Sequence, residues 1–220
     1  MLQTVKGVIF DFNGTLFWDT PLHNKAWDLF LEKFDIKLSD KEKGEKIHGK
    51  SNKEIMLNIF SRPLTDEEIF KLGIEKELIY QKLCLQSDMQ LAPGAMDFIM
   101  FLKEINLPYT IATSSGIENV DFYFKHLDLG LYFNRSSVIY NDGSLRSKPH
   151  PDIFIKALES MGIKAEESLI FEDSFAGIQA AENAGVKNIV IINSNNDNYS
   201  AWNYPQIKNF MDFNTELLFN

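Results

Sequence analysis

Cysteine is almost missing from this sequence of 220 residues, because Cys84 stands alone. A single cysteine excludes an intramolecular disulfide and is typical of a reducing compartment. Long apolar runs are missing as well: none approaches the roughly 20 residues that a membrane-spanning helix needs. The N-terminal stretch MLQTVKGVIF lacks the basic flank and the apolar stretch of a signal peptide. We therefore expect a cytoplasmic protein without a membrane partner.

Basic residues are in the minority, and no long basic run occurs. The chain has 22 Lys and Arg against 31 Asp and Glu, which gives a net charge of −9. Because such a chain repels polyanions, nucleic acid is not an expected partner, and local cations must attract any anionic substrate. Hydrophobic residues make up 45% of the sequence, enough for a packed core. No clear dimer face is evident, so we expect a monomer or a weak homo-oligomer.

Short apolar runs rich in Val and Ile alternate with helix-like segments. The runs predict buried strands at Val5–Phe10, Pro108–Ala112, Ser136–Tyr140, Ser168–Glu172 and Asn188–Ile192. Apolar residues three and four positions apart predict helices at Ala95–Ile105, Gly116–Leu127, Pro151–Gly162 and Phe175–Gly185. The alternation predicts an α/β fold with a doubly wound, Rossmann-like parallel sheet. Its active site is expected at the carboxyl ends of the strands.

One long segment breaks this alternation, because it contains no strand candidate. Its clearest helical patterns are Trp27–Phe34, Glu54–Phe60 and Glu75–Leu85, and turn-forming residues lie near both of its ends. We expect an all-helical cap domain of residues 18–91, inserted into a discontinuous core domain of residues 1–17 and 92–220. The two linkers could act as hinges over the site.

Polar residues of catalytic type follow four of the predicted strands. They are Asp11, Thr113, Ser114, Lys148, Glu172 and Asp173. The carboxyl ends of parallel strands lie at one edge of a sheet, so three carboxylates, one ammonium group and two hydroxyls should meet there. Close carboxylates repel one another unless a cation separates them, and Mg²⁺ prefers such oxygen ligands. Lys148 and the Thr113 hydroxyl could then hold a phosphate opposite the metal.

Four motifs, DFNGT, TIATSS, KPHPDIF and FEDSFAGIQAAENAG, resemble in order those of the haloacid dehalogenase (HAD) superfamily. Each motif alone has an ordinary explanation as a turn, a helix cap or a solvated loop, but the four in this order are specific. The last two look like those of the β-phosphoglucomutase-like phosphatases and phosphomutases. The resemblance covers almost the whole chain and implies a hydrolase that acts on a small phosphorylated metabolite.

The resemblance also implies roles for individual residues. Asp11 would be the nucleophile that becomes a phospho-aspartate. The phosphate would be held by Thr113, the Ser114 backbone N–H and Lys148. The Mg²⁺ ligands would be Asp11, the backbone carbonyl of Asn13, Glu172 and Asp173.

Asn13 departs from the family pattern, which usually has aspartate two residues after the nucleophile. That aspartate exchanges protons with the leaving oxygen and then with water, a contribution of about 10²–10⁴-fold. Asparagine cannot do this near neutral pH, so we expect a poor phosphatase towards ordinary sugar phosphates. Asn13→Asp is expected to raise turnover at least about tenfold. Three explanations stay open: a weakened or specialised natural enzyme, a catalytically silent protein that binds a phosphorylated metabolite, and an engineered trap of an active phosphatase or β-phosphoglucomutase.

The resemblance marks further substrate-binding candidates in the helical segment. They are His23, Trp27, Gly49, Lys50, Asn52 and Lys76. His23 could assist proton transfer or bind substrate. Asn52 stands where the mutase has an arginine for its non-reacting phosphate, so a monophosphate is the preferred substrate. Lys76 coincides with a cap lysine of the mutase, and a solvated helix lysine is the competing interpretation.

Overall fold

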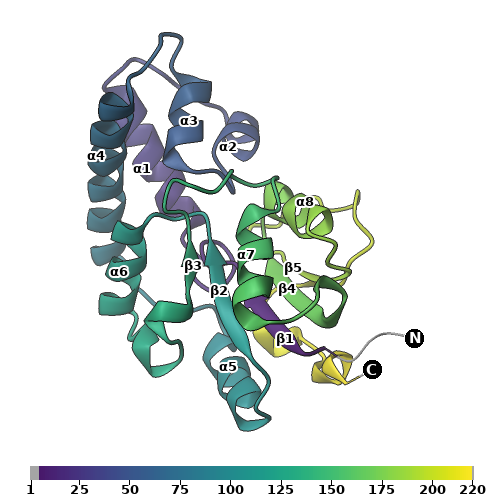
Figure 1. Ribbon diagram of the computed structural model, residues 1–220. Coiled ribbons are helices and arrows are strands. Elements are labelled where there is room, and N and C mark those ends of the chain that lie inside the picture. Colours follow the sequence, from purple (N-terminus) through teal and green to yellow (C-terminus); the bar gives the residue numbers. More distant parts are fainter. Residues whose placement is uncertain (1–4, 220) are drawn as a thin grey trace.

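The structure is a computed structural model that describes residues 5–219. Residues 1–4, the start of the segment tested above for a signal peptide, lie outside the described residues. Six parallel strands form one sheet in the order β3-β2-β1-β4-β5-β6 (Figure 1). Their bounds are β1 Gly7–Phe10, β2 Tyr109–Thr113, β3 Ile139–Tyr140, β4 Ser168–Glu172, β5 Asn188–Ile192 and β6 Gln206–Ile207. The strand order reverses direction at β1, which places a ligand crevice beside its carboxyl end.

Both faces of the sheet are covered by helices. Val8 and Phe10 of β1 belong to an apolar cluster with α5 (Ala95–Glu104) and α6 (Ile117–His126). Ile9, on the opposite face, belongs to a second cluster with α7 (Asp152–Met161) and α8 (Phe175–Asn183). Side chains of a strand alternate between faces, so a strand buried on both sides must be apolar throughout. The predicted doubly wound parallel sheet is confirmed.

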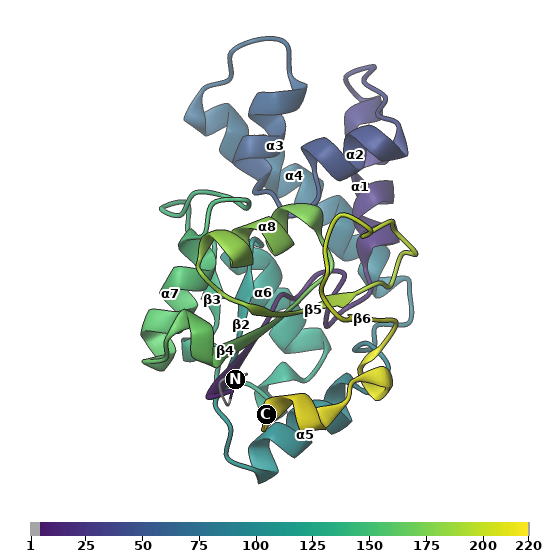
Figure 2. The same cartoon turned by 90° about the vertical axis from the view of Figure 1, so that its right-hand side faces the viewer.

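Four more helices lie at one end of the sheet (Figures 1 and 2). They are α1 Thr20–Glu32, α2 Asp40–Lys46, α3 Asn52–Ile59 and α4 Asp66–Leu85. Trp27, Phe30, Ile55, Met56 and Ile69 form an apolar cluster within this group. The carboxyl-terminal part of α4 instead joins the main core of the sheet. Among residues 5–219, no helix combines the length and apolar character of a membrane span.

Short elements and one late predicted helix start account for differences from the predicted strands and helices. The third strand is two residues long, and a 3₁₀ turn at Arg135–Ser137 precedes it. Strand β6 pairs with β5, but its two residues are too few to show a periodic pattern. Helix α2 was not predicted, although its Ser39–Glu42 capping box is a readable start signal. Helix α4 begins nine residues before the predicted Glu75, after a second capping box.

Candidate active site

A cavity of about 810 Å³ lies between the carboxyl edge of the sheet and the four helices α1–α4. Most of the site residues expected from the sequence line it. They are Asp11, Asn13, His23, Trp27, Gly49, Lys50, Asn52, Lys76, Thr113, Ser114 and Asp173. The remaining two, Lys148 and Glu172, are buried behind the wall of the cavity. Lys148 donates to Asp11 directly, and it also donates to Glu172. The structure therefore brings together residues that the sequence spreads over more than 160 positions (Asp11 to Asp173).

Three carboxylates and one ammonium group meet at the ends of β1 and β4, where Asp11 and Asp173 line the cavity and Lys148 and Glu172 lie behind them. Lys148 is 1% exposed, and its Nζ lies 2.5 Å from Asp11 Oδ1 and 2.5 Å from Glu172 Oε1. Ligand atoms of Asp11, Glu172 and Asp173 all lie within 4.8 Å of one another. One ammonium group therefore faces three acids in a buried place.

This imbalance shows in the pKa values of the acids. Burial raises the pKa of Asp11 to about 7; Lys148 opposes the rise and the charge of Glu172 adds to it. Burial also raises the pKa of Asp173 well above its usual value, helped by the charges of Glu172 and Asp11. Burial alone would lower the pKa of Lys148, but the two carboxylates outweigh it and raise the pKa. A further cation would let all three acids ionise, so the donor set fits a hard divalent ion such as Mg²⁺.

Two glycines allow the acids to approach the backbone. Gly14 has φ +82°, and a Cβ there would lie 2.0 Å from Asp173 Oδ2. A Cβ on Gly177, in the first turn of α8, would lie 1.7 Å from Glu172 Oε1. The backbone N–H of Ser174 donates to Glu172 Oε2 at 2.7 Å. The glycines of the first and fourth motifs are thus needed to hold this acid cluster.

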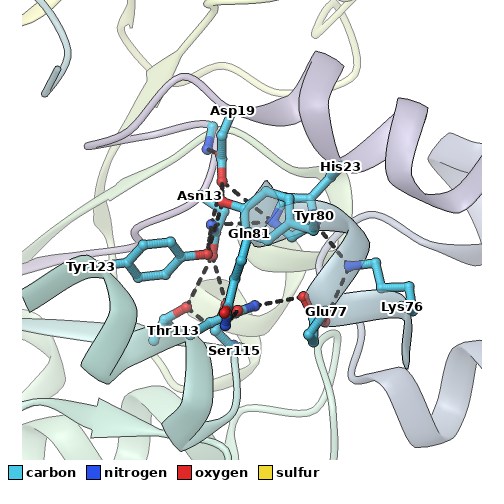
Figure 3. A network of polar contacts seen from close by, with 12 residues as sticks. Asn13, Asp19, His23, Lys76, Glu77, Tyr80, Gln81, Thr113, Ser115 and Tyr123 are labelled. Atoms are coloured by element: carbon cyan, nitrogen blue, oxygen red, sulfur yellow. Dashed lines mark hydrogen bonds and ion pairs between the residues drawn. The ribbon is translucent and has the colours of Figure 1, made fainter. Parts of the chain in front are cut away.

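Asn13 lies in a polar network with Asp19, Ser115 and Tyr123 (Figure 3). Its Nδ2 donates to Asp19 Oδ2 at 2.6 Å and to the Tyr123 hydroxyl at 2.7 Å. Its Oδ1 accepts from Ser115 Oγ at 2.8 Å and, at 3.4 Å, from Thr113 Oγ1. Every polar atom of the amide is therefore engaged.

Sequence reasoning missed four members of this network: Asp19, Tyr80, Ser115 and Tyr123. Asp19 is fully buried, and it also accepts from the Gly14 N–H at 3.1 Å and from the Tyr80 hydroxyl. In the sequence Asp19 signals a turn, and the two tyrosines look like ordinary apolar helix positions. A signal existed only for Ser115, which belongs to the TIATSS motif.

His23 connects this network to Lys76. The His23 ring stacks on Tyr80 with 3.8 Å between centroids, and its Nε2 lies 3.3 Å from Asp19 Oδ2. Its Nδ1 lies 3.0 Å from Lys76 Nζ (Figure 3). Lys76 is 1% exposed, and its Nζ is 5.0 Å from the centroid of the Trp27 ring. The interpretation of Lys76 as a solvated lysine is therefore wrong: its charge lies among rings and a carboxylate.

The other candidates of the helical group bind protein partners. Asn52 Nδ2 donates to Glu77 Oε1 at 2.6 Å, and Lys76 Nζ donates to the same oxygen at 3.1 Å. Lys50 Nζ lies 3.8 Å from a carboxylate oxygen of the neighbouring helix turn. The Ser114 hydroxyl donates to the Gly49 carbonyl at 2.9 Å, which ties the helical group to the sheet edge.

Comparisons with known proteins agree with this architecture. The pattern of the haloacid dehalogenase-like hydrolases matches residues 5–185. A phosphorylated carbohydrates phosphatase of Thermotoga maritima is 27% identical over 198 residues, which cover 88% of each chain. A β-phosphoglucomutase of Bacillus subtilis is 28% identical over 188 residues, covering 83% of this chain and 81% of the relative.

A solved structure resembles the whole chain. The crystal structure of a HAD hydrolase of family IA, variant 3, from Entamoeba histolytica superimposes with a TM-score of 0.85 at 33% identity and covers 97% of each chain. The family match spans the first strand, the helical group and the acid cluster. This chain therefore belongs to the haloacid dehalogenase-like hydrolases and, among them, to the β-phosphoglucomutase-like group of phosphatase-like hydrolases.

Proposed function

We propose that this protein is a Mg²⁺-dependent phosphatase that hydrolyses a small, sugar-phosphate-like monoester through a phospho-aspartate on Asp11. The observation that carries the proposal is that Asp11 and Asp173, which line the cavity, meet Lys148 and Glu172 directly behind them. Relatives named as a phosphorylated carbohydrates phosphatase and a β-phosphoglucomutase support the substrate class.

The first chemical step belongs to Asp11. Lys148 holds Oδ1 of this carboxylate, so the attack on phosphorus falls to Oδ2. A bond forms between that oxygen and phosphorus, the bond to the leaving oxygen breaks, and the leaving oxygen takes a proton from solvent, because the Asn13 amide has none to give. Thr113 and Ser114, at the end of β2, would orient the phosphoryl group. In the second step water attacks phosphorus and loses a proton to solvent, the bond to Asp11 breaks, and inorganic phosphate leaves.

Mg²⁺ would be held by Asp11, Glu172, Asp173 and the backbone carbonyl of Asn13. When bound, it supplies positive charge opposite the phosphoryl oxygens, where negative charge increases during transfer. The ammonium group of Lys148 would supply a second positive charge, which belongs to the protein itself. Its two carboxylate partners keep it protonated and in place.

A monophosphate fits the charges of the cavity better than a bisphosphate. On the helical side the lining lysines face acids: Lys50 lies 3.8 Å from Glu54, Lys53 lies 2.8 Å from Asp66, and Lys76 lies 3.1 Å from Glu77. A second phosphate would have to displace one of these carboxylates. Pairing of this kind lowers the attraction that a lysine offers to an anion.

We further propose that residues 18–91 act as a cap on a core of residues 1–17 and 92–220. Hydrogen bonds join the two parts beside the cavity: Ser114 Oγ donates to the Gly49 carbonyl, and the Ser51 N–H donates to Ser147 Oγ at 3.2 Å. Such a cap would exclude water from the reacting groups and select the substrate. A cytoplasmic location stays a prediction.

A second candidate function is a silent binder of a phosphorylated metabolite, and the engaged amide of Asn13 favours it. Phosphate release from a panel of sugar monophosphates, measured with and without Mg²⁺, separates the two functions. We expect release that needs Mg²⁺ and is lost in Asp11→Asn. A metabolite that raises the melting temperature without release would instead indicate a binder. Neither release nor a thermal shift across the panel would overturn both functions.

A further inference from the structure

Asp19 is an acid with an unusual set of partners. It is fully buried, and it is the N-cap residue of α1, yet its carboxylate does not cap that helix, all of whose residues the structure describes. Aspartate at an N-cap ordinarily accepts from the first-turn N–H groups. Here the carboxylate instead accepts from Asn13 Nδ2, the Gly14 N–H and the Tyr80 hydroxyl. The buried carboxylate thus accepts three hydrogen bonds from donors outside its own helix.

The protons of the network have one consistent arrangement. Tyr80 donates to Asp19, so its oxygen is free to accept from the Tyr123 hydroxyl at 3.0 Å. The Tyr123 oxygen in turn accepts from Asn13 Nδ2 at 2.7 Å. Because Ser115 donates to the other end of the amide, turning the amide round would set its oxygen against the Asp19 carboxylate. The neighbours therefore require an NH₂ group at this place.

A carboxylate at position 13 would meet an opposite environment. Its oxygen would stand where Nδ2 now lies, 2.6 Å from Asp19 Oδ2. Two carboxylates at this distance would set acceptor against acceptor, and each would lose a hydrogen-bond donor. His23 Nε2 lies 3.3 Å from Asp19 Oδ2 and 3.3 Å from Asn13 Nδ2, and its other ring nitrogen faces Lys76 Nζ at 3.0 Å.

We propose that Asp19 is a positioning residue for Asn13: the Asp19 carboxylate accepts one of its hydrogen bonds from position 13, and this requirement for a donor selects an amide there. The inference concerns a pairing of residues rather than the hydrolytic reaction, and it rests on the proposed function only for its effect on turnover. The amide at position 13 is then explained by its hydrogen bond to Asp19, and not only as the replacement of a catalytic acid.

The test is a transposition of the two side chains. We compare Asn13→Asp, Asp19→Asn and the double variant Asn13→Asp/Asp19→Asn, each in the full chain. Asn13→Asp is expected to lower the melting temperature by at least about 5 °C, and the double variant to recover at least half of that loss. Asn13→Ala, which removes the donors but adds no charge, is the matched control and should fall between wild type and Asn13→Asp.

The turnover number kcat is a second readout. If Asp19 had only a structural role, the exchange of the two side chains would not raise kcat. The double variant has an acid at position 13 without a charged neighbour, so its kcat on a sugar monophosphate should exceed that of wild type and of Asn13→Asp by at least about tenfold, with little change in KM. Recovery of the melting temperature without this gain would reject a positioning role in catalysis.

The remaining outcomes also decide the question. If Asn13→Asp does not accumulate as folded protein, a folded double variant supports the pairing, and an unfolded one overturns it. Wild-type stability of Asn13→Asp would overturn it as well. If wild type releases no phosphate from any substrate, the proposed function fails while the unfolding comparison still tests the pair.

Discussion

Two groups of buried acids lie beside the same cavity, one around Asp11 and one around Asp19. In the first, three carboxylates share one ammonium group, and burial leaves the pKa of Asp11 raised to about 7. In the second, one carboxylate has three hydrogen-bond donors from its surroundings. We propose that an added cation completes the first group, whereas the carboxylate of the second already has its hydrogen-bond donors. Buried acids that outnumber their cations indicate a site that binds a ligand. A buried acid that has all of its hydrogen-bond donors indicates a structural role.

The largest expected effect comes from removing the nucleophile in the first group. Asp11→Asn should lower phosphate release by at least about 10³-fold, because it removes the oxygen that we propose attacks phosphorus. The control is Asp28→Asn, the same change on α1 at a half-exposed residue that pairs with Lys43. Its release rate should stay at the wild-type value. Release by Asp11→Asn within about tenfold of the wild-type rate would show that Asp11 is not the nucleophile.

Removing the ammonium group should destabilise the first group. Lys148→Met leaves its acids without a cation, and breaking a buried pair costs about 3–5 kcal/mol. Urea unfolding without Mg²⁺ should show this loss, and added Mg²⁺ should restore part of it. The comparison variant is Lys156→Met, which removes a half-exposed lysine of α7 and should change the free energy of unfolding by less than about 0.5 kcal/mol.

Magnesium should stabilise wild type, because it neutralises the acids of the first group. At 100 times its dissociation constant the gain is about 2.7 kcal/mol, measured as a rise in melting temperature that a chelator reverses. Asp173→Asn should abolish the rise, and Tyr80→Phe should keep it, because Tyr80 belongs to the second group. An equal rise in Asp173→Asn would place the metal elsewhere.

The smallest effect is expected from one donor of the second group. Tyr80→Phe removes one hydrogen bond to Asp19 and the acceptor of the Tyr123 hydroxyl, a loss of about 1–3 kcal/mol in the free energy of unfolding. Tyr132→Phe is the control, because the Tyr132 hydroxyl contacts Met96 sulfur at the surface. An equal loss in the free energy of unfolding in the two variants would show that the hydrogen bond from Tyr80 does not stabilise the Asp19 network.

Much of the fold was predictable from local patterns. Five of the six strands and the helices α5–α8 follow apolar runs and helical spacing that the sequence shows directly. The misses are short or polar elements, such as β6 and α2. The start of α4 was placed too late, because its polar first turns hide the helical period and only its capping residues mark the beginning.

By itself, the sequence determined which acids and which lysine meet at the sheet edge. A parallel sheet brings the ends of its strands to one side, so residues that follow strands converge whatever their separation along the chain. Only the tertiary structure decided the surroundings of Asn13 and Lys76. Asn13 and Tyr123 are 110 positions apart, and Tyr80 and Tyr123 lie at helix positions that look like ordinary core. No local pattern encodes a hydrogen bond between such positions, because it depends on how helices from distant segments pack over the sheet.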